Sequence, residues 1–133
     1  YGDHRDLHSF PTRRSSDLQL EQIFATALDI YLSGESGPRG CFTVMTAASE
    51  AVSDPDIRSM VLEGLTELDK AFGICFRHAK ERGELPEGAD PAALAHLASA
   101  TIHTIAIRAR ARVPRGELEA IVKGAVDLMC RAQ

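Results

Sequence analysis

The sequence predicts an all-α domain of five helices. The main observation is one long helical pattern from Asp54 to Gly83, in which apolar residues recur at the spacing of a single helix face. Helix-starting and helix-ending signals punctuate the rest of the chain, and no segment has the alternation of a strand. At about 1.5 Å per residue the long helix would span a small domain. We therefore expect the other helices to pack against it.

The long helix is marked at both ends. Asp54 is suited to capping the first free N–H groups, and Pro55 fits the first helical position. Gly83 can adopt the left-handed conformation that ends a helix. The apolar face that we expect to be buried consists of Ile57, Met60, Val61, Leu65, Leu68, Phe72, Cys75, Phe76 and Ala79.

Four further helices follow from periodicity and from Gly and Pro punctuation. They are expected at residues 19–32, 41 to about 52, 91 to about 112, and 114 to about 131. The second of the five is apolar nearly all round, which predicts a buried helix. The fourth opens with Asp90-Pro91, the same cap and proline as the long helix, and is rich in alanine.

Composition limits the function. The chain has 133 residues, enough for one domain, and a net charge of −4 with a pI near 5.7, which argues against nucleic-acid binding by bulk electrostatics. Its three cysteines, Cys41, Cys75 and Cys130, form neither a disulfide framework nor a zinc pattern, and fit a reducing cytoplasm. No apolar run approaches membrane-spanning length.

Residues 1–18 have neither helical nor strand periodicity. Their sequence, YGDHRDLHSFPTRRSSDL, resembles the conceptual translation of a short-read sequencing adapter. We therefore expect a non-native, disordered leader at 1–18 and a native domain at 19–133. The alternative is a disordered native tail containing Arg13 and Arg14, and in neither case do we interpret these arginines as a DNA-binding arm.

The order of motifs resembles the C-terminal effector-binding and dimerisation domain of the TetR family of transcriptional regulators. The resemblance covers about residues 19–133. Its motifs are Arg39-Gly40-Cys41-Phe42, Ala47-Ala48-Ser49-Glu50, Ser53-Asp54-Pro55-Asp56-Ile57-Arg58, Gly83-Glu84-Leu85-Pro86, Asp90-Pro91 and the two terminal helices. No recognition helix or basic cluster of a helix-turn-helix is found. The family's DNA binding is therefore expected of a parent protein, through an N-terminal domain that is missing here.

The resemblance implies a cytoplasmic homodimer that senses a small apolar or amphipathic effector, which releases the parent repressor from operator DNA. It implies no cofactor, no metal, no catalytic residues and no membrane. Apolar residues with a few polar anchors are suitable for lining an effector pocket. The candidates are Phe24, Leu28, Phe42, Met45, Thr46, Ser49, Phe72, Phe76, His103, Thr104 and Ile107. Candidates for the dimer interface on the last two helices are Ala98, Ile102, Leu118, Ile121, Val122 and Ala125.

Other interpretations of these residues remain open. An apolar stripe at helical spacing is more often solid core than pocket lining. His96 and His103 share a helix face and could contribute to a metal site, although histidines so placed more often serve as hydrogen-bonding core residues. Cys41 or Cys75 could be a thiol sensor, and Cys41 with His78 or His103 could form a hydrolase pair, but no third orienting group is evident. The main alternative function is a stand-alone helical interaction module without a ligand cavity.

Overall fold

A computed structural model describes residues 15–34 and 41–130, and throughout this part of the chain the regular structure is helical. The all-α, five-helix prediction is confirmed. The helices are α1 (Ser15–Leu32), α2 (Phe42–Ser49), α3 (Pro55–Glu81), α4 (Pro91–Arg110) and α5 (Arg115–Cys130).

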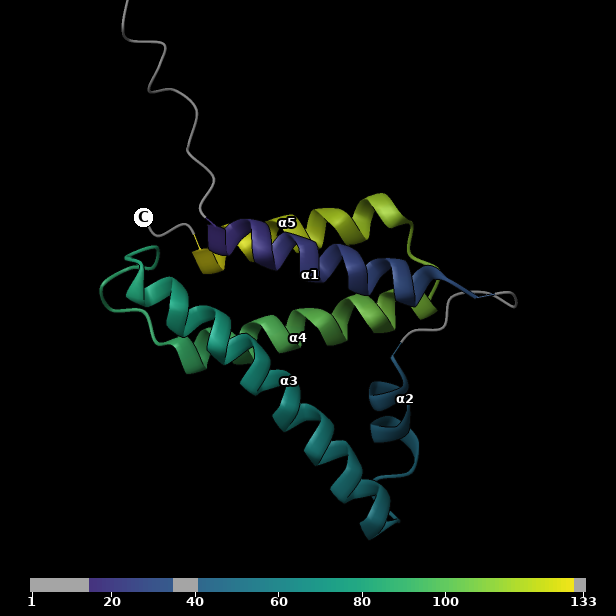
Figure 1. Cartoon of the computed structure of the whole chain (residues 1–133). Coiled ribbons are helices and arrows are strands. Elements are labelled where there is room, and N and C mark those ends of the chain that lie inside the picture. Colours follow the sequence, from purple (N-terminus) through teal and green to yellow (C-terminus); the bar gives the residue numbers. More distant parts are fainter. Residues whose placement is uncertain (1–14, 35–40, 131–133) are drawn as a thin grey trace, which may run out of the picture.

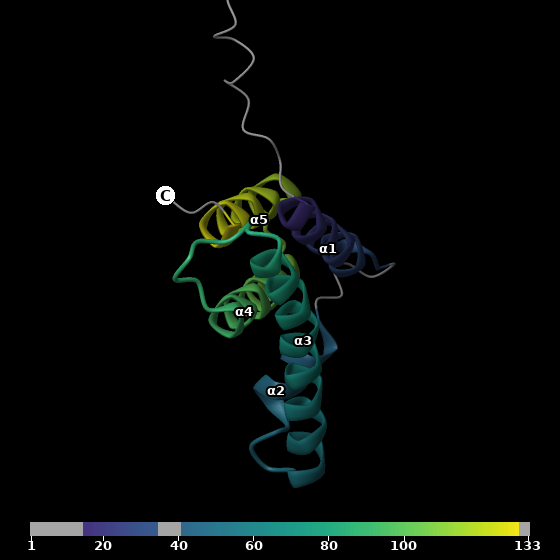
Figure 2. The same ribbon diagram turned by 60° about the vertical axis from the view of Figure 1, so that its left-hand side comes forward.

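The helices form a bundle from which one arm projects. Helices α1 and α5 lie side by side, and α4 packs beneath both of them (Figure 1). The C-terminal half of α3 crosses α4, whereas its N-terminal half runs on past the bundle and carries α2 (Figure 2). Among the described elements α2 contacts only α3 and α4. The long helix thus belongs to both parts of the molecule, the bundle with α1, α4 and α5 and the projecting arm with α2.

The core fills the space between α1, α3, α4 and α5. Phe24 of α1 and Phe72 of α3 stack with ring centroids 5.9 Å apart at its centre. Burying a large apolar side chain contributes about 1.5–3 kcal/mol relative to leaving it exposed. The most deeply buried large side chains are Leu20, Phe24, Leu28, Phe72, Phe76, Ile105, Leu118 and Val126.

Both ends of α3 are as the sequence predicts. The Asp54 carboxylate accepts hydrogen bonds from the N–H groups of Asp56 (2.9 Å) and Ile57 (3.3 Å), so the first turn is capped. At the other end Gly83 has φ +70°, and the Glu84 N–H donates to the Ala79 carbonyl at 2.9 Å. This is the Schellman arrangement, which a glycine in the left-handed region favours.

Helix α4 ends in the same way but without a glycine. Arg112 has φ 64°, and the Val113 N–H donates to the Arg108 carbonyl at 3.0 Å. The helix therefore stops at Arg110, two residues before the predicted end. A side chain at positive φ is strained, because its Cβ approaches the following carbonyl.

Helix α2 is shorter than predicted and is not buried all round. It ends at Ser49, and turns follow up to Ser53 instead of helix to Val52. The Arg58 side chain accounts for the early end, because its guanidinium donates to the carbonyls of Ala51 (2.9 Å) and Val52 (2.8 Å), which leave the helical path. Peripheral packing leaves Met45 exposed, and Met60 of the predicted α3 face is exposed as well.

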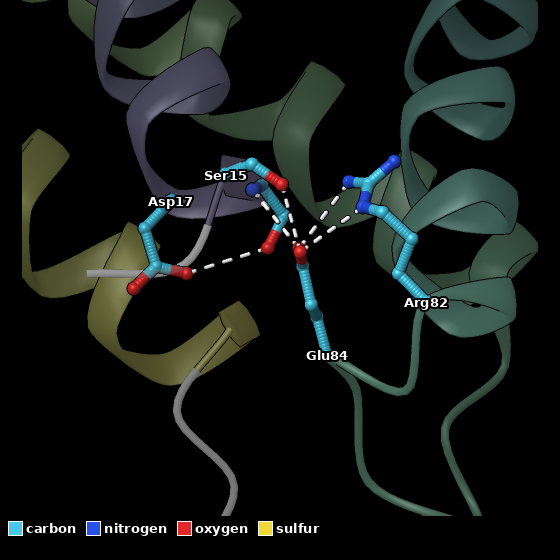
Figure 3. A network of polar contacts seen from close by, with 5 residues as sticks. Ser15, Asp17, Arg82 and Glu84 are labelled. Carbon is cyan, nitrogen blue, oxygen red and sulfur yellow. Dashed lines mark hydrogen bonds and ion pairs between the residues drawn. The ribbon is translucent and has the colours of Figure 1, made fainter. Parts of the chain in front are cut away.

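Helix α1 begins at Ser15 rather than Gln19, so the expected disorder does not extend to residues 15–18. The Glu84 carboxylate anchors this start, accepting from Ser15 Oγ at 2.7 Å and from the Ser16 N–H at 3.0 Å (Figure 3). Arg82 donates to the same carboxylate at 3.0 and 3.2 Å, and this hydrogen bonding, with smaller contributions from Ser15 and Ser16, lowers the pKa of Glu84 to about 2. The remaining leader residues, Arg13 and Arg14 included, lie outside the described range, and the origin of the leader stays a prediction.

A second polar contact joins α1 to α5. Arg115 at the start of α5 donates to the Asp29 carboxylate at 2.7 Å and to Glu119, one turn along its own helix, at 2.8 Å. These contacts hold the beginning of α5 against the last turns of α1. Across residues 15–34 and 41–130, none of the helices combines the length and the apolar character that crossing a bilayer requires.

Candidate functional site

One candidate for a ligand site is a hollow of about 390 Å³ beneath α2. Three helices supply its walls, and the described residues that line it are Thr43, Val44, Ala47, Leu65 and His103. The walls are mainly apolar, with one hydroxyl and one imidazole as polar groups. This composition and size are typical of small-molecule sites.

The local sequence explains why α2 lies over α3. Gly64 on α3 faces Thr43, and a Cβ placed on this glycine would lie 3.6 Å from Thr43 Oγ1. That distance is an ordinary van der Waals contact, so Gly64 marks the place where α2 touches α3, and an alanine would fit there as well. Thr43 and Ala47 are one turn apart, so both face α3 and the hollow. Met45 and Ser49 are exposed on other faces of the same helix.

His103 brings the one ionisable side chain among the described lining residues. It is half-buried on α4, and burial lowers its pKa, with the Asp69 charge acting in the opposite direction. Burial therefore favours the neutral form of the imidazole. A neutral imidazole has one nitrogen that donates and one that accepts a hydrogen bond.

A polar cluster lies one helical turn from the hollow. Asp69 follows Leu65 by one turn of α3, and its carboxylate accepts from Ser99 Oγ at 2.5 Å. Its second oxygen lies 3.2 Å from His96 Nδ1. Both oxygens are thus engaged across the α3–α4 contact, so we interpret this cluster as a structural link between the two helices.

The predicted effector-binding residues divide into several groups. Phe24, Phe72 and Phe76 are packed in the core, and Leu28, also a core residue, borders a hollow of about 310 Å³ between α1 and α5. Ile107 is exposed on α4, and Thr104 lines a hollow between α4 and α5, where its Oγ1 accepts a hydrogen bond from Arg108 Nε at 3.1 Å. The side chains of Phe42 and Thr46 lie outside the described part of the structure. Of the described candidates, His103 alone lines the hollow beneath α2.

Sequence reasoning missed Thr43, Val44, Ala47 and Leu65 as lining residues. Because α2 is apolar on most sides, periodicity does not distinguish the face that meets α3. The available signal was Thr43 on one helix and Gly64 on the next. These two residues can be matched only when the relative position of the two helices is known.

A separate apolar face covers the outer sides of α4 and α5. Leu97 on α4 is 56% exposed and Leu128 on α5 is 84% exposed. Between the two helices lies a hollow of about 300 Å³, and the described residues that line it are Leu97, Ala100, Thr101, Thr104, Ala125, Leu128 and Met129. We call these residues the α4–α5 face.

The predicted dimer residues fall only partly on this face. Ala98, Ile102, Leu118 and Val122 are buried in the core of the monomer itself. Ala125 lines the α4–α5 face, and Ile121 is partly buried beside the core. Four of the six candidates are thus turned into the core of the monomer, and the dimer interface itself stays a prediction.

One further groove and two cysteines were candidates for other chemistry. An open groove of about 560 Å³ between α1 and α3 is lined by Gln19, Gln22, Ile23, Thr26, Cys75 and His78. Cys75 and Cys41 are partly exposed free thiols, and Cys41 hydrogen-bonds the Tyr31 hydroxyl. Burial, aided by Cys41, raises the pKa of Tyr31. Within the described residues, histidines, cysteines and carboxylates do not form a group of three able to hold a metal.

Comparison with known proteins identifies the domain. The family model described as "Tetracyclin repressor-like, C-terminal domain" matches residues 18–125, most of the chain. The chain belongs to this family. Its five helices are those of a TetR-type C-terminal domain, and the proteins of this family regulate transcription. No curated protein sequence matches the chain.

Solved structures of TetR regulators share the fold. A cysteine mutant of the TetR family transcriptional regulator CifR, complexed with 26-bp double-strand operator DNA, has a TM-score of 0.74 at 22% identity, covering 86% of this chain and 59% of its own. A TetR transcriptional regulator from Chloroflexus aurantiacus J-10-FL has a TM-score of 0.65 at 18% identity, covering 95% of this chain and 61% of its own. The chain thus spans about three fifths of the length of these regulators.

Proposed function

We propose that this domain is the effector-sensing and dimerisation half of a TetR-type regulator, acting in the cytoplasm. The parent protein would bind operator DNA through a further domain and be released by a small apolar or amphipathic molecule. The observation that supports sensing is the hollow beneath α2, because it combines ligand-sized volume with apolar walls and two polar groups. We assign no catalytic step and no cofactor to the domain.

The position of the hollow suits a sensor. Its walls come from α2, α3 and α4, and α2 has no support beyond α3 and α4 among the described elements. A ligand beneath α2 would therefore change the packing of the helix that is least firmly held. An effector shifts a conformational equilibrium only through its different affinities for the two states. A loosely supported wall is where such a difference can arise.

Filling the hollow tests the sensing half of the proposal. Ala47→Phe places a ring in the hollow, whereas Ala120→Phe adds the same ring on the exposed side of α5. A collection of small apolar and amphipathic molecules is screened by thermal shift against the unmodified chain and both variants. We expect compounds that raise the Tm of the unmodified chain and of Ala120→Phe, but not of Ala47→Phe. Hits that bind Ala47→Phe equally well would place the binding elsewhere and overturn this assignment.

The α4–α5 face supports the dimerisation half. Contiguous exposed apolar surface on a monomer marks an interaction site, and a two-fold pairing of two such helices makes a four-helix interface. Leu97→Glu places a charge on this face, and Ile30→Glu is a matched control, because Ile30 on α1 is also 56% exposed. We expect light scattering to give a dimer mass for the unmodified chain and Ile30→Glu, and a monomer mass for Leu97→Glu.

The alternative function gives different results in both experiments. A stand-alone interaction module would be a monomer in solution, and its Tm would not respond to any member of the collection. Joint failure of the two experiments would therefore favour the module over the regulator.

A further inference from the structure

Charge and hydrogen bonding around the hollow beneath α2 restrict the chemistry of its ligand. We propose that the hollow selects an uncharged amphipathic molecule, with an apolar body against Val44, Ala47 and Leu65 and one polar group hydrogen-bonded to His103. This inference rests on the proposed sensing function and adds the chemical class of the effector to it.

The apolar body follows from the walls. Val44, Ala47 and Leu65 offer only hydrocarbon, and none of the described lining residues carries a permanent charge. A ligand polar along its whole length would lose hydrogen bonds to water without replacement, which is costly in an apolar environment. An aromatic or aliphatic body is thus the part that these walls accommodate.

The polar contact follows from His103, which lines the hollow opposite the Thr43 hydroxyl on α2. Its ring is half-buried on the α4 wall, and burial favours the neutral imidazole. A neutral imidazole can donate to a carbonyl or ether oxygen, or accept from a hydroxyl. The hydrogen bond therefore does not require charge on either partner.

Anions are disfavoured by the negative charge that acts on His103. The Asp69 carboxylate lies one turn of α3 beyond Leu65 and acts on the His103 ring electrostatically. A ligand carboxylate in the hollow would meet this negative charge, and the described lining residues include no lysine or arginine to compensate it.

Cations gain little from the same carboxylate. Asp69 Oδ1 accepts from Ser99 Oγ at 2.5 Å, and Oδ2 lies 3.2 Å from His96 Nδ1. With both oxygens engaged, and with no carboxylate among the described lining residues, an ammonium group would be desolvated against aliphatic walls without an opposite charge to pair with. The uncharged form of a given skeleton is accordingly the preferred one.

Four probes with one skeleton test this class. They are 2-phenylethanol, ethylbenzene, phenylacetate and 2-phenylethylammonium, and binding to the full chain is followed by NMR of His103 and of the Leu65 and Val44 methyl groups. We expect 2-phenylethanol to bind about three- to tenfold more tightly than ethylbenzene, the range of one hydrogen bond. We expect phenylacetate and 2-phenylethylammonium to bind at least tenfold more weakly than 2-phenylethanol.

Variants of His103 separate the hydrogen bond from general packing. His103→Leu is expected to remove the preference for 2-phenylethanol over ethylbenzene while ethylbenzene still binds. His103→Gln keeps a neutral hydrogen-bonding group and is expected to retain the preference. Unchanged backbone NMR signals in the bundle would show that both variants are folded.

The outcomes distinguish a failure of this inference from a failure of the proposed sensing function on which it rests. Phenylacetate or 2-phenylethylammonium binding as tightly as 2-phenylethanol would overturn the chemical class while leaving a ligand site beneath α2. The same applies if His103→Leu keeps the preference for 2-phenylethanol. Failure of all four probes to perturb His103, Leu65 or Val44 would instead remove the sensing function itself, and this inference with it.

Discussion

Replacing Glu84 by glutamine should destabilise the domain in a pH-dependent manner. The Glu84 carboxylate accepts hydrogen bonds from Arg82, from Ser15 Oγ and from the Ser16 N–H, so it joins the end of α3 to the start of α1. Glutamine retains the size of the side chain and one acceptor oxygen, but removes the charge. Because the Ser16 contribution is a backbone N–H, any residue other than proline at that position can provide it.

The magnitude follows from the pKa of Glu84, which falls from an ordinary value near 4.5 to about 2 in the folded domain. That difference corresponds to about 3 kcal/mol at about 1.4 kcal/mol per pKa unit. The side chains of Arg82 and Glu84 are 39% and 16% exposed, so solvent screens the interaction. We therefore expect Glu84→Gln to lower the free energy of unfolding by about 1–2 kcal/mol at pH 7.

The pH dependence has a definite sign. A carboxyl group with a lowered folded-state pKa contributes its stability fully above the unfolded-state pKa, near 4.5, and loses it as the pH falls toward 2. Urea denaturation of the unmodified chain and of Glu84→Gln should therefore give a difference that shrinks to less than half by about pH 3. The exposed Glu87 in the same loop provides the control Glu87→Gln, for which we expect little change. An equal loss at pH 7 and pH 3 would refute the charge-based explanation.

Three further predictions concern single positions. Gly64→Ala should stabilise the domain by about 1 kcal/mol in urea denaturation, because alanine favours helix and its Cβ would lie 3.6 Å from Thr43, an ordinary contact. Destabilisation would show that α2 and α3 are packed too closely for this Cβ. Arg112→Gly should raise stability by about 0.5–1 kcal/mol by relieving the strain at φ 64°, offset partly by a more flexible unfolded chain; no gain in the same assay would contradict the left-handed conformation. Burial lowers the pKa of His103 below its ordinary 6.5, so the stability of the domain should decrease as the pH falls below about 6.5. The variant His103→Gln should lose this part of the pH dependence. NMR titration of the ring checks the pKa, and a value above 6.5 would contradict the burial argument.

Periodicity and end signals were sufficient to predict the fold. The long apolar repeat and the caps at Asp54 and Gly83 specify α3, and Asp90-Pro91 specifies the start of α4. These are local effects, because a cap or a left-handed glycine acts within one turn of the chain. The ends of α2 and α4 were less predictable. The end of α2 depends on hydrogen bonds from the Arg58 side chain to two carbonyls, and the end of α4 on Arg112, a non-glycine residue at positive φ.

The lining of the hollow beneath α2 was harder to predict than the fold, because an apolar stripe does not indicate which elements it packs against. Phe24 and Phe72 have the side chains expected of a pocket wall, yet they stack on one another in the core. On α4, Ile102 is turned inward while Leu97 is turned outward, and the apolar character that both share does not indicate which of the two is buried. Only the relative positions of the helices separate core, cavity and outer face.

The projecting arm has a consequence for local dynamics. Helix α2 and the N-terminal half of α3 lack the several layers of neighbours that surround the other end of α3 (Figure 2). Segments with few buried contacts open at lower free energy than the global transition, so backbone amides of this arm should exchange with deuterium before those of the bundle. A molecule held beneath α2 would slow that exchange selectively, and the ordering of the arm would itself be the signal passed along the continuous backbone of α3.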